Sequence, residues 1–319
     1  MILPHDTELF QRHGENPIIT VRDVPYLANS VFNAGVTMVA DETLLLMRVE
    51  DRRGISHLTV ARSRNGISDW RIDPQPSLLP DPERYPEELW GIEDPRIVWL
   101  EDQGEWAITY TAYSRGGPMV SLACTTDFKD FRRMGPIMPP EDKDAALFPV
   151  RFGGRWAMIH RPVATFPATG AHMWISFSPD LKHWGDHRIL IQARRGAWWD
   201  ANKIGLSPPP LRTDEGWLVL YHGVRDTAGG SIYRLGLALL DLEDPCRVIA
   251  RSDQWVFSPE ESYEVFGDVN KVVFPCGWLV IGDTVRLYYG GADSCIALAT
   301  ASLSDLLNWL RESNDSPEA

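Results

Sequence analysis

Residues 55–70 read ISHLTVARSRNGISDW, an alternating strand-like run followed by a polar turn that ends in an aromatic residue. The same pattern recurs in MVSLACTTDFKDF at residues 119–131 and in HMWISFSPDLKHW at residues 172–184. The final aromatic residues of these three segments are 61 and 53 positions apart. Alternation of apolar and polar residues between turns is typical of β-strands. A β-unit therefore repeats along this chain at nearly constant spacing.

A fourth copy, CIALATASLSDLLNW at residues 295–309, ends 125 positions after Trp184, about two repeat lengths. The gap predicts a degenerate fifth copy, and residues 233–248, YRLGLALLDLEDPCRV, fit that pattern. Two further strand-like runs precede every copy. The second runs lie at residues 44–48, 107–111, 157–161, 218–222 and 286–290, and the first runs lie around residues 32–36, 94–98, 147–152, 203–206 and 269–274.

Five units of three or four strands predict an all-β fold, a five-bladed β-propeller. A β-sandwich with irregular insertions is the alternative, but it does not account for the spacing of the repeats. Near the C-terminus, leucines at helical spacing predict a short amphipathic helix over Ser304–Leu310, with Ser304 as its N-cap. No linker rich in Pro, Gly or Ser divides the chain, so we expect residues 1–319 to form a single propeller domain.

The composition excludes several classes of protein. Of the 319 residues, 44% are hydrophobic and 24% are charged, as in a globular domain, and the net charge of −13 argues against a nucleic-acid partner. The apolar runs are too short to cross a bilayer and the first residues lack a signal-peptide core, so we expect a cytoplasmic protein without membrane contact. The four cysteines are scattered, which favours reduced structural thiols.

The axis of a propeller brings together residues that are far apart in the chain. The predicted first strands and the adjoining loops contribute Asn33, Asp94, Lys143, Lys203 and Asp268, and the second strands end near Arg48, Arg161 and His222. Several cations on the axis of an acidic protein indicate an anionic ligand.

The same segments carry motifs of a known family. They are FNAG at 32–35, RVED at 48–51, GIEDPR at 91–96, LFP at 147–149, KIG at 203–205, YHGV at 221–224, GDV at 267–269 and AD at 292–293. Together, in this order, they resemble glycoside hydrolase family 130, and the resemblance runs from about Asn16 to Leu307. The resemblance implies a five-bladed propeller that acts as a β-mannoside phosphorylase or a related β-mannosidase.

A phosphorylase of this family is implied to be inverting: inorganic phosphate attacks the anomeric carbon of a β-mannosyl unit and α-mannose 1-phosphate is released. The resemblance makes Asp94 the general acid, whose proton passes through the mannosyl 3-hydroxyl. Because phosphate is itself a nucleophilic anion, cations can replace the second carboxylate that an inverting hydrolase uses. The predicted phosphate ligands are Arg48, Lys143, Lys203, His222 and the hydroxyl of Tyr233.

The sugar site is predicted from the same resemblance and from residue chemistry. Short carboxylates and amides fix sugar hydroxyls, and aromatic rings stack on sugar faces. The predicted substrate-binding residues are Asn33, Asp51, Trp199, Asp268 and Asp293.

Each residue also has a structural interpretation. Asp94 could cap a turn, Arg48 could form an ion pair with a neighbouring carboxylate, and His222 could be a neutral core histidine. Lys143 lies in the charged run EDKD, which is also typical of a solvated loop. The aspartates could pair with nearby arginines, and the Trp198–Trp199 pair could be blade packing.

We expect neither a metal nor a cofactor, only phosphate as co-substrate, because the histidines and cysteines lack metal-ligand spacing. The rival functions are an inverting β-mannosidase on the same fold and a sugar-binding propeller without activity. The sequence leaves open which linkage is cleaved, β-1,2 or β-1,4, and which acceptor sugar is released. It also leaves open the oligomeric state, for which a homo-oligomer is one possibility.

Overall fold

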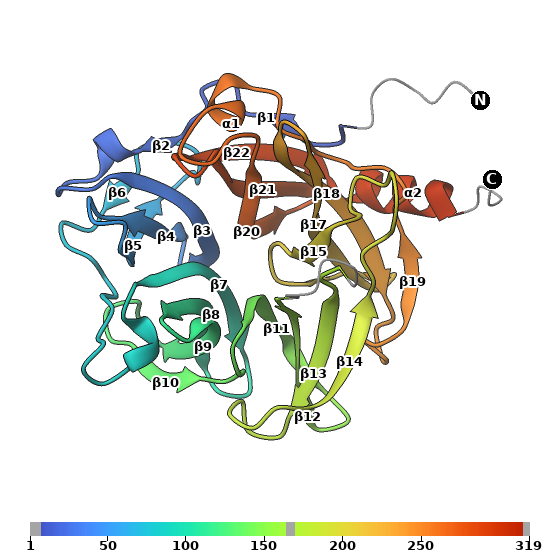
Figure 1. Cartoon of the computed structure of the whole chain (residues 1–319), viewed down its shortest axis with the longest axis horizontal. Coiled ribbons are helices and arrows are strands. Elements are labelled where there is room, and N and C mark those ends of the chain that lie inside the picture. The colour runs from blue at the N-terminus through green and yellow to red at the C-terminus, as the bar shows by residue number, and fades with distance from the viewer. Residues whose placement is uncertain (1–7, 164–169, 315–319) are drawn as a thin grey trace.

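The computed structural model describes residues 8–163 and 170–314. Five antiparallel sheets are arranged around one axis, and Figure 1 views the ring of sheets along that axis. The innermost strand of each sheet is the first of its unit, and these strands meet at the centre. This arrangement confirms the five-bladed propeller that the repeat predicts.

The first three blades each contain four consecutive strands. Blade 1 contains β3 (Ser30–Val39), β4 (Glu42–Glu50), β5 (Ser56–Ser63) and β6 (Arg71–Ile72). Blade 2 contains β7 (Ile92–Leu100), β8 (Glu105–Ser114), β9 (Gly117–Thr125) and β10 (Arg132–Pro136). Blade 3 contains β11 (Asp142–Phe152), β12 (Arg155–Pro162), β13 (Met173–Ser178) and β14 (Gly185–Ile191).

Blades 4 and 5 are less regular. Blade 4 contains β15 (Lys203–Leu206), β17 (Trp217–Thr227), β18 (Gly230–Leu240) and β19 (Val248–Arg251), with β16 (Leu211–Arg212) paired to β17. Blade 5 contains β20 (Val273–Ile281), β21 (Thr284–Gly291) and β22 (Cys295–Ser302), and its outer strands are β1 (Gln11–Arg12) and β2 (Ile19–Thr20). The predicted first strand at residues 269–274 begins later, at Val273, because residues 266–272 form a loop.

The short helices lie outside the sheets. They are the 3-10 turns η1 (Val21–Asp23) and η2 (Pro86–Glu88), α1 (Ser262–Val265) and the C-terminal α2 (Leu303–Asn314). The predicted C-terminal helix is confirmed, but it is longer than Ser304–Leu310 and its cap differs. Ser304 lies in the first turn of α2, whereas the Ser302 hydroxyl accepts the backbone N–H of Asp305. Among the described residues, α2 is the longest helix, and no helix has the length and apolar character needed to cross a membrane.

The repeated polar turn has a physical cause. After the third strand of a blade, one side-chain oxygen accepts the backbone N–H groups two and three residues ahead, which closes a tight turn. The residues that do this are Asn65, Asp127, Asp180 and Asp241. The aromatic residue at the end of the turn packs back on it, and Trp70 and Trp184 donate their indole N–H to turn carbonyls.

The core consists of apolar clusters between neighbouring blades. Leu44 and Leu46 of blade 1 pack with Ile108 and Tyr110 of blade 2, and comparable clusters join the other neighbouring pairs around the ring. Burial of these faces is the main source of stability.

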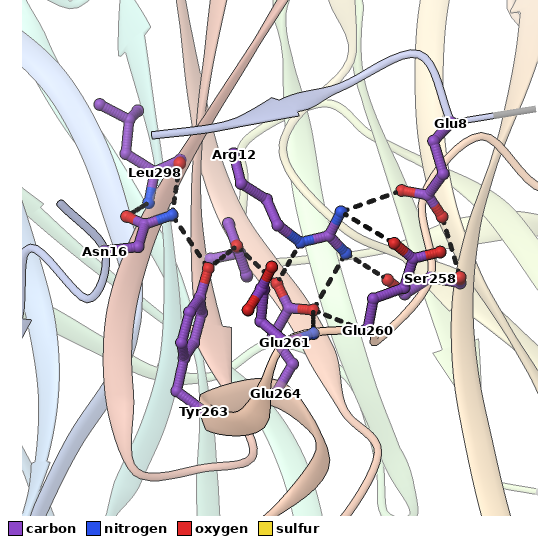
Figure 2. A network of polar contacts seen from close by, with 10 residues as sticks. Glu8, Arg12, Asn16, Ser258, Glu260, Glu261, Tyr263, Glu264 and Leu298 are labelled. Carbon is purple, nitrogen blue, oxygen red and sulfur yellow. Dashed lines mark hydrogen bonds and ion pairs between the residues drawn. The ribbon is translucent and has the colours of Figure 1, made fainter. Parts of the chain in front are cut away.

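The N-terminal segment closes the ring. Strand β1 pairs with β22, so blade 5 is built from both ends of the chain. Figure 2 shows the polar contacts that fix this closure: the Arg12 guanidinium donates to Glu264 at 2.8 Å and to the Ser258 carbonyl at 2.6 Å. The fully buried Glu264 carboxylate also accepts the Tyr289 hydroxyl. The closure thereby holds α1, which precedes the loop at residues 266–272.

Candidate active site

The same irregularity at the start of three innermost strands builds the site. Strands β3, β7 and β11 each carry a β-bulge near their first residues. At these bulges Asn33, Asp94 and Asp144 adopt φ values of 45°, 53° and 54°. Asn and Asp tolerate this left-handed region better than most side chains. The repeat therefore places three short polar residues, all buried, on the innermost strands of blades 1 to 3.

Asp94 lies in a polar environment with little access to water. Its Oδ1 accepts the Asn33 amide at 2.9 Å and Arg48 Nη1 at 3.1 Å, and the residue is 5% exposed. Burial alone would raise the pKa of Asp94, but the charges of Arg48, Arg96 and Lys143 outweigh this effect and keep the pKa below its usual value. Without a bound ligand, Asp94 is therefore a carboxylate.

Arg48 connects Asp94 to other carboxylates. Its Nη2 lies 3.1 Å from Glu93 and 3.7 Å from Glu50, and its Nε donates to the Ser56 hydroxyl at 2.8 Å. The guanidinium also lies over the Phe32 ring, 4.5 Å from its centre. These contacts hold Arg48 from several sides.

Asp293 enters the same cluster from the tight turn between β21 and β22. Burial, opposed in part by Arg48, and repulsion from Asp94 and Glu93 raise the pKa of Asp293 to about 7. Burial likewise raises the pKa of Glu93. The first cluster thus combines a carboxyl group whose pKa is lowered, Asp94, with one whose pKa is raised to about 7, Asp293.

Asp144 organises a second cluster next to the first. Its Oδ2 accepts Arg161 Nε at 2.7 Å and lies 3.4 Å from His222 Nε2. Burial lowers the pKa of His222 to about 4, against the attraction of Asp144. His222 is therefore neutral at pH 7 and does not add to the positive charge of the site, contrary to the count of cations made from the sequence.

Arg96 ties the two clusters together. It is fully buried, and it donates to the carbonyls of Asp94 at 3.0 Å, Leu206 at 3.0 Å and Ser207 at 2.8 Å. Its Nη2 also lies 3.6 Å from Asp144. Arg96 thereby fixes the strand that carries Asp94 against the innermost strand of blade 4.

A cavity of about 510 Å³ opens beside these clusters. Lys143, Arg161 and Lys203 line it, together with the acidic residues Glu141 and Asp226. Burial and the charge of Arg161 lower the pKa of Lys203, whose ammonium lies 5.1 Å from the centre of the Tyr233 ring. Three cations from two blades make this cavity suited to a small oxyanion.

A hydrogen-bonded chain, buried except at its last residue, supports the strand that carries Lys143. His160 Nδ1 lies 2.6 Å from Asp142 Oδ2, His160 Nε2 lies 2.7 Å from the Ser176 hydroxyl, and that hydroxyl lies 2.7 Å from His187 Nδ1. The chain crosses blade 3 from β11 to β14.

Among the described residues, no group of three or more His, Cys, Asp or Glu side chains has an arrangement that would hold a metal ion.

Comparison with known proteins identifies the family. The family model described as beta-1,4-mannooligosaccharide phosphorylase matches residues 7–312. The chain belongs to glycoside hydrolase family 130. It is 35% identical over 312 residues to the beta-1,4-mannooligosaccharide phosphorylase of Ruminococcus albus, covering 95% of this chain and 91% of the relative.

Other members of family 130 have different linkages in their names. The chain is 38% identical over 255 residues to a 1,2-beta-oligomannan phosphorylase of Thermoanaerobacter, covering 79% of this chain and 80% of the relative. The solved structure of the beta-1,2-mannobiose phosphorylase of Listeria innocua, in complex with beta-1,2-mannobiose, is similar with a TM-score of 0.85 and 30% identity. That similarity covers 95% of this chain and 99% of the other.

Most residues predicted for the family 130 site lie in these clusters. Asn33, Arg48, Asp94 and Asp293 form the first cluster. Lys143 and Lys203 line the cavity, and His222 and Tyr233 pack beside it, with ring centres 5.9 Å apart.

Three predicted substrate-binding residues are placed differently. Asp51 closes the turn between β4 and β5, where it accepts the N–H groups of Arg53 and Ile55 and pairs with the Arg53 side chain. Asp268 lies on the exposed loop at residues 266–272 and accepts the Asn29 amide at 3.3 Å. Trp199 is 3% exposed and packs in the core, so it offers no face on which an acceptor sugar could stack.

The sequence analysis placed Arg161 near the axis without giving it a role, and it left out three residues of the clusters: Glu93, Arg96 and Asp144. Asp144 had a usable signal, because it occupies the same place in the third first strand as Asn33 and Asp94 occupy in theirs. Glu93 and Arg96 had no such signal. They lie next to a motif residue, and nothing in the sequence shows which of the adjacent charged residues face inward.

Proposed function

We propose that this chain catalyses the phosphorolysis of β-mannosides: inorganic phosphate cleaves a terminal β-mannosyl unit and α-mannose 1-phosphate is released. The single observation that carries the proposal is the position of Lys143. Its charge acts on Asp94, and the same side chain lines the cavity with Arg161 and Lys203. An anion held by these cations is therefore close to the buried carboxyl group of Asp94.

The proposed chemistry follows from this arrangement. A phosphate oxygen forms a bond to the anomeric carbon while the bond from that carbon to the glycosidic oxygen breaks, with inversion. The glycosidic oxygen receives a proton that comes from Asp94 and passes through the mannosyl 3-hydroxyl. Asn33 and Asp293 hold hydroxyl groups of the mannosyl unit. The cations position the phosphate and offset its charge, which lowers the barrier mainly through proximity and electrostatics.

Asp94 must be protonated to act as an acid, yet three cations hold it ionised in the free enzyme. Phosphate binding resolves this conflict. A dianion close to Lys143 offsets the positive charge that acts on Asp94, and the mannosyl unit excludes water from the carboxyl group. Both effects raise the pKa of Asp94. The enzyme is thus expected to take up a proton when both substrates bind.

The test is a set of incubations with β-1,2- and β-1,4-linked manno-oligosaccharides and mannosyl-glucose, each with and without inorganic phosphate. The proposal predicts mannose 1-phosphate only when phosphate is present, and its formation at least about a hundredfold more slowly with the Asp94→Asn variant. Equal amounts of free mannose in both incubations would instead identify a hydrolase. The panel also identifies the linkage that this chain cleaves, on which its relatives differ.

A further inference from the structure

A second cavity lies on blade 4, outside the clusters described above. It has a volume of about 290 Å³ and lies between the loop at residues 194–199 and the segment at residues 253–255. Three tryptophans line it: Trp198, Trp199 and Trp255. The remaining lining residues are Arg195, Ala197, Asp253 and Gln254.

The tryptophans of this cavity are held in place before any ligand binds. The Arg194 guanidinium lies 4.5 Å from the ring centre of Trp198, and the Arg234 guanidinium lies 4.2 Å from that of Trp255. The Trp199 indole donates to the Asp253 carbonyl at 2.9 Å. Nevertheless Trp198 stays 40% exposed. A rigid, exposed aromatic face costs little conformational entropy when a ligand binds.

The loop that presents Trp198 is also fixed at both ends. Arg194 donates to the fully buried Asp200 at 3.0 Å and to the Ser252 carbonyl at 2.9 Å, which ties the loop to the opposite wall of the cavity. Arg225 of β17 donates to the Ala197 carbonyl at 2.6 Å. These hydrogen bonds hold the loop in place and so maintain the shape of the cavity.

The chemistry of the lining favours a neutral, polyhydroxylated ligand. Arg195 and Asp253 carry opposite charges, and Asp253 is paired with Arg194 at 2.8 Å, so the lining has no cluster of like charges, unlike the cavity that Lys143, Arg161 and Lys203 line. The guanidinium, carboxylate and amide groups can donate to and accept from hydroxyl groups. The axial hydrogens of a pyranose ring form an apolar face that packs on an indole.

The two cavities share one loop. Trp199 lines the second cavity and Asn202 lines the first, and these residues are three positions apart. Their α-carbons are therefore separated by at most about 11 Å. A short oligosaccharide can span that separation while its terminal unit is held at Asn33 and Asp293, beside the first cavity.

We propose that the cavity at Trp198 is a remote subsite that binds a pyranose unit of the same manno-oligosaccharide whose terminal unit is cleaved. This inference rests on the proposed function for the identity of the sugar. The subsite makes affinity depend on chain length: a disaccharide does not reach it, whereas longer oligosaccharides stack one unit on Trp198.

The test compares phosphorolysis of mannosides of two to six units by the wild type, Trp198→Ala and a control, Trp99→Ala. Trp99 is 42% exposed, much as Trp198 is, but lies at the end of β7 away from Asp94. For Trp198→Ala we expect the KM of the longest substrates to rise roughly three- to tenfold, because one aromatic contact contributes that much to binding. The KM of the disaccharide should not change. Trp198→Phe, which keeps an aromatic face, should retain most of the affinity, and Trp99→Ala all of it. An equal effect on the disaccharide and the hexasaccharide, or no effect on either, would overturn the subsite.

A binding measurement separates this inference from the proposed function. Calorimetric titration with β-1,4- and β-1,2-linked mannohexaose measures affinity without phosphate. Weaker binding of mannohexaose to Trp198→Ala than to Trp99→Ala supports the subsite even if no mannose 1-phosphate forms. Normal phosphorolysis combined with identical binding to both variants overturns the subsite and leaves the proposed function intact.

Discussion

Replacing Arg48 with Met tests whether this arginine neutralises the carboxylates at the axis. Arg48 lies 3.1 Å from both Asp94 and Glu93, and its side chain is only 13% exposed. Removing one partner of a buried ion pair leaves an uncompensated charge, which costs about 3–5 kcal/mol. For a chain of this size that loss corresponds to a fall in melting temperature of roughly 4–8 °C. We expect this loss at pH 8, where the carboxylates are ionised.

The dependence of this loss on pH provides the decisive part of the test. Without Arg48, the pKa values of Asp94, Glu93 and Asp293 rise, and these groups become protonated as the pH falls from 8 to 5. A neutral carboxyl group needs no cation, so the destabilisation should shrink over this range. Arg62→Met is the matched control in blade 1, because Arg62 and Asp73 form a partly exposed pair worth about 1 kcal/mol or less. Thermal unfolding at pH 5, 6, 7 and 8 measures both variants. A loss for Arg48→Met that is constant with pH, or no larger than that of the control, would refute the reasoning.

Three further predictions follow from buried charges. The fold raises the pKa of Asp293 from 3.8 to about 7, so the wild type loses stability as the pH rises between these values. The melting temperature of Asp293→Asn minus that of the wild type should therefore increase from pH 5 to about 7.5 and then stay constant. A difference that does not change with pH would argue against this pKa shift. Lys203→Met should raise the KM for phosphate about tenfold or more, because a hydrogen bond to a charged group contributes that much, and should leave the KM for the mannoside nearly unchanged. Initial-rate kinetics with each substrate varied in turn measure both constants, and an equal rise in both would contradict the prediction. Arg12→Met leaves the fully buried Glu264 without its cation. The free energy of unfolding, measured by urea denaturation, should fall by about 3–5 kcal/mol. A loss below about 1 kcal/mol would mean that the polar contacts in Figure 2 contribute little to stability.

The propeller could be predicted from the sequence because its repeat has local causes. Asn65, Asp127 and Asp180 each close the same turn with their own side chains, and this chemistry is visible in the sequence as a polar residue at a fixed place after a strand. The closure of blade 5 was not predicted. It depends on the pairing of Gln11–Arg12 with β22, almost 300 positions away, and two residues carry no strand pattern.

The site could be predicted only in part because burial and orientation are tertiary properties. Trp198 and Trp199 are adjacent and chemically identical in the sequence. What distinguishes them is that Gly223 and Gly236, on β17 and β18, leave room for the Trp199 ring: a β-carbon at either position would lie about 2.5 Å from it. His222 could be counted as a cation only until its burial was known. The Asp94 cluster, by contrast, depends on bulges at equivalent places in repeated strands.

The most direct test of the central claim, that Asp94 supplies the proton that phosphorolysis requires, compares two leaving groups. The rate of phosphate-dependent formation of mannose 1-phosphate is measured for wild type and Asp94→Asn, with a manno-oligosaccharide and with 2,4-dinitrophenyl β-mannoside. The dinitrophenolate leaves without a proton. Asp94→Asn should therefore lower the rate on the oligosaccharide at least about a hundredfold, which is the usual contribution of general acid catalysis. It should lower the rate on the aryl mannoside far less. Equal losses on both substrates would contradict the claim.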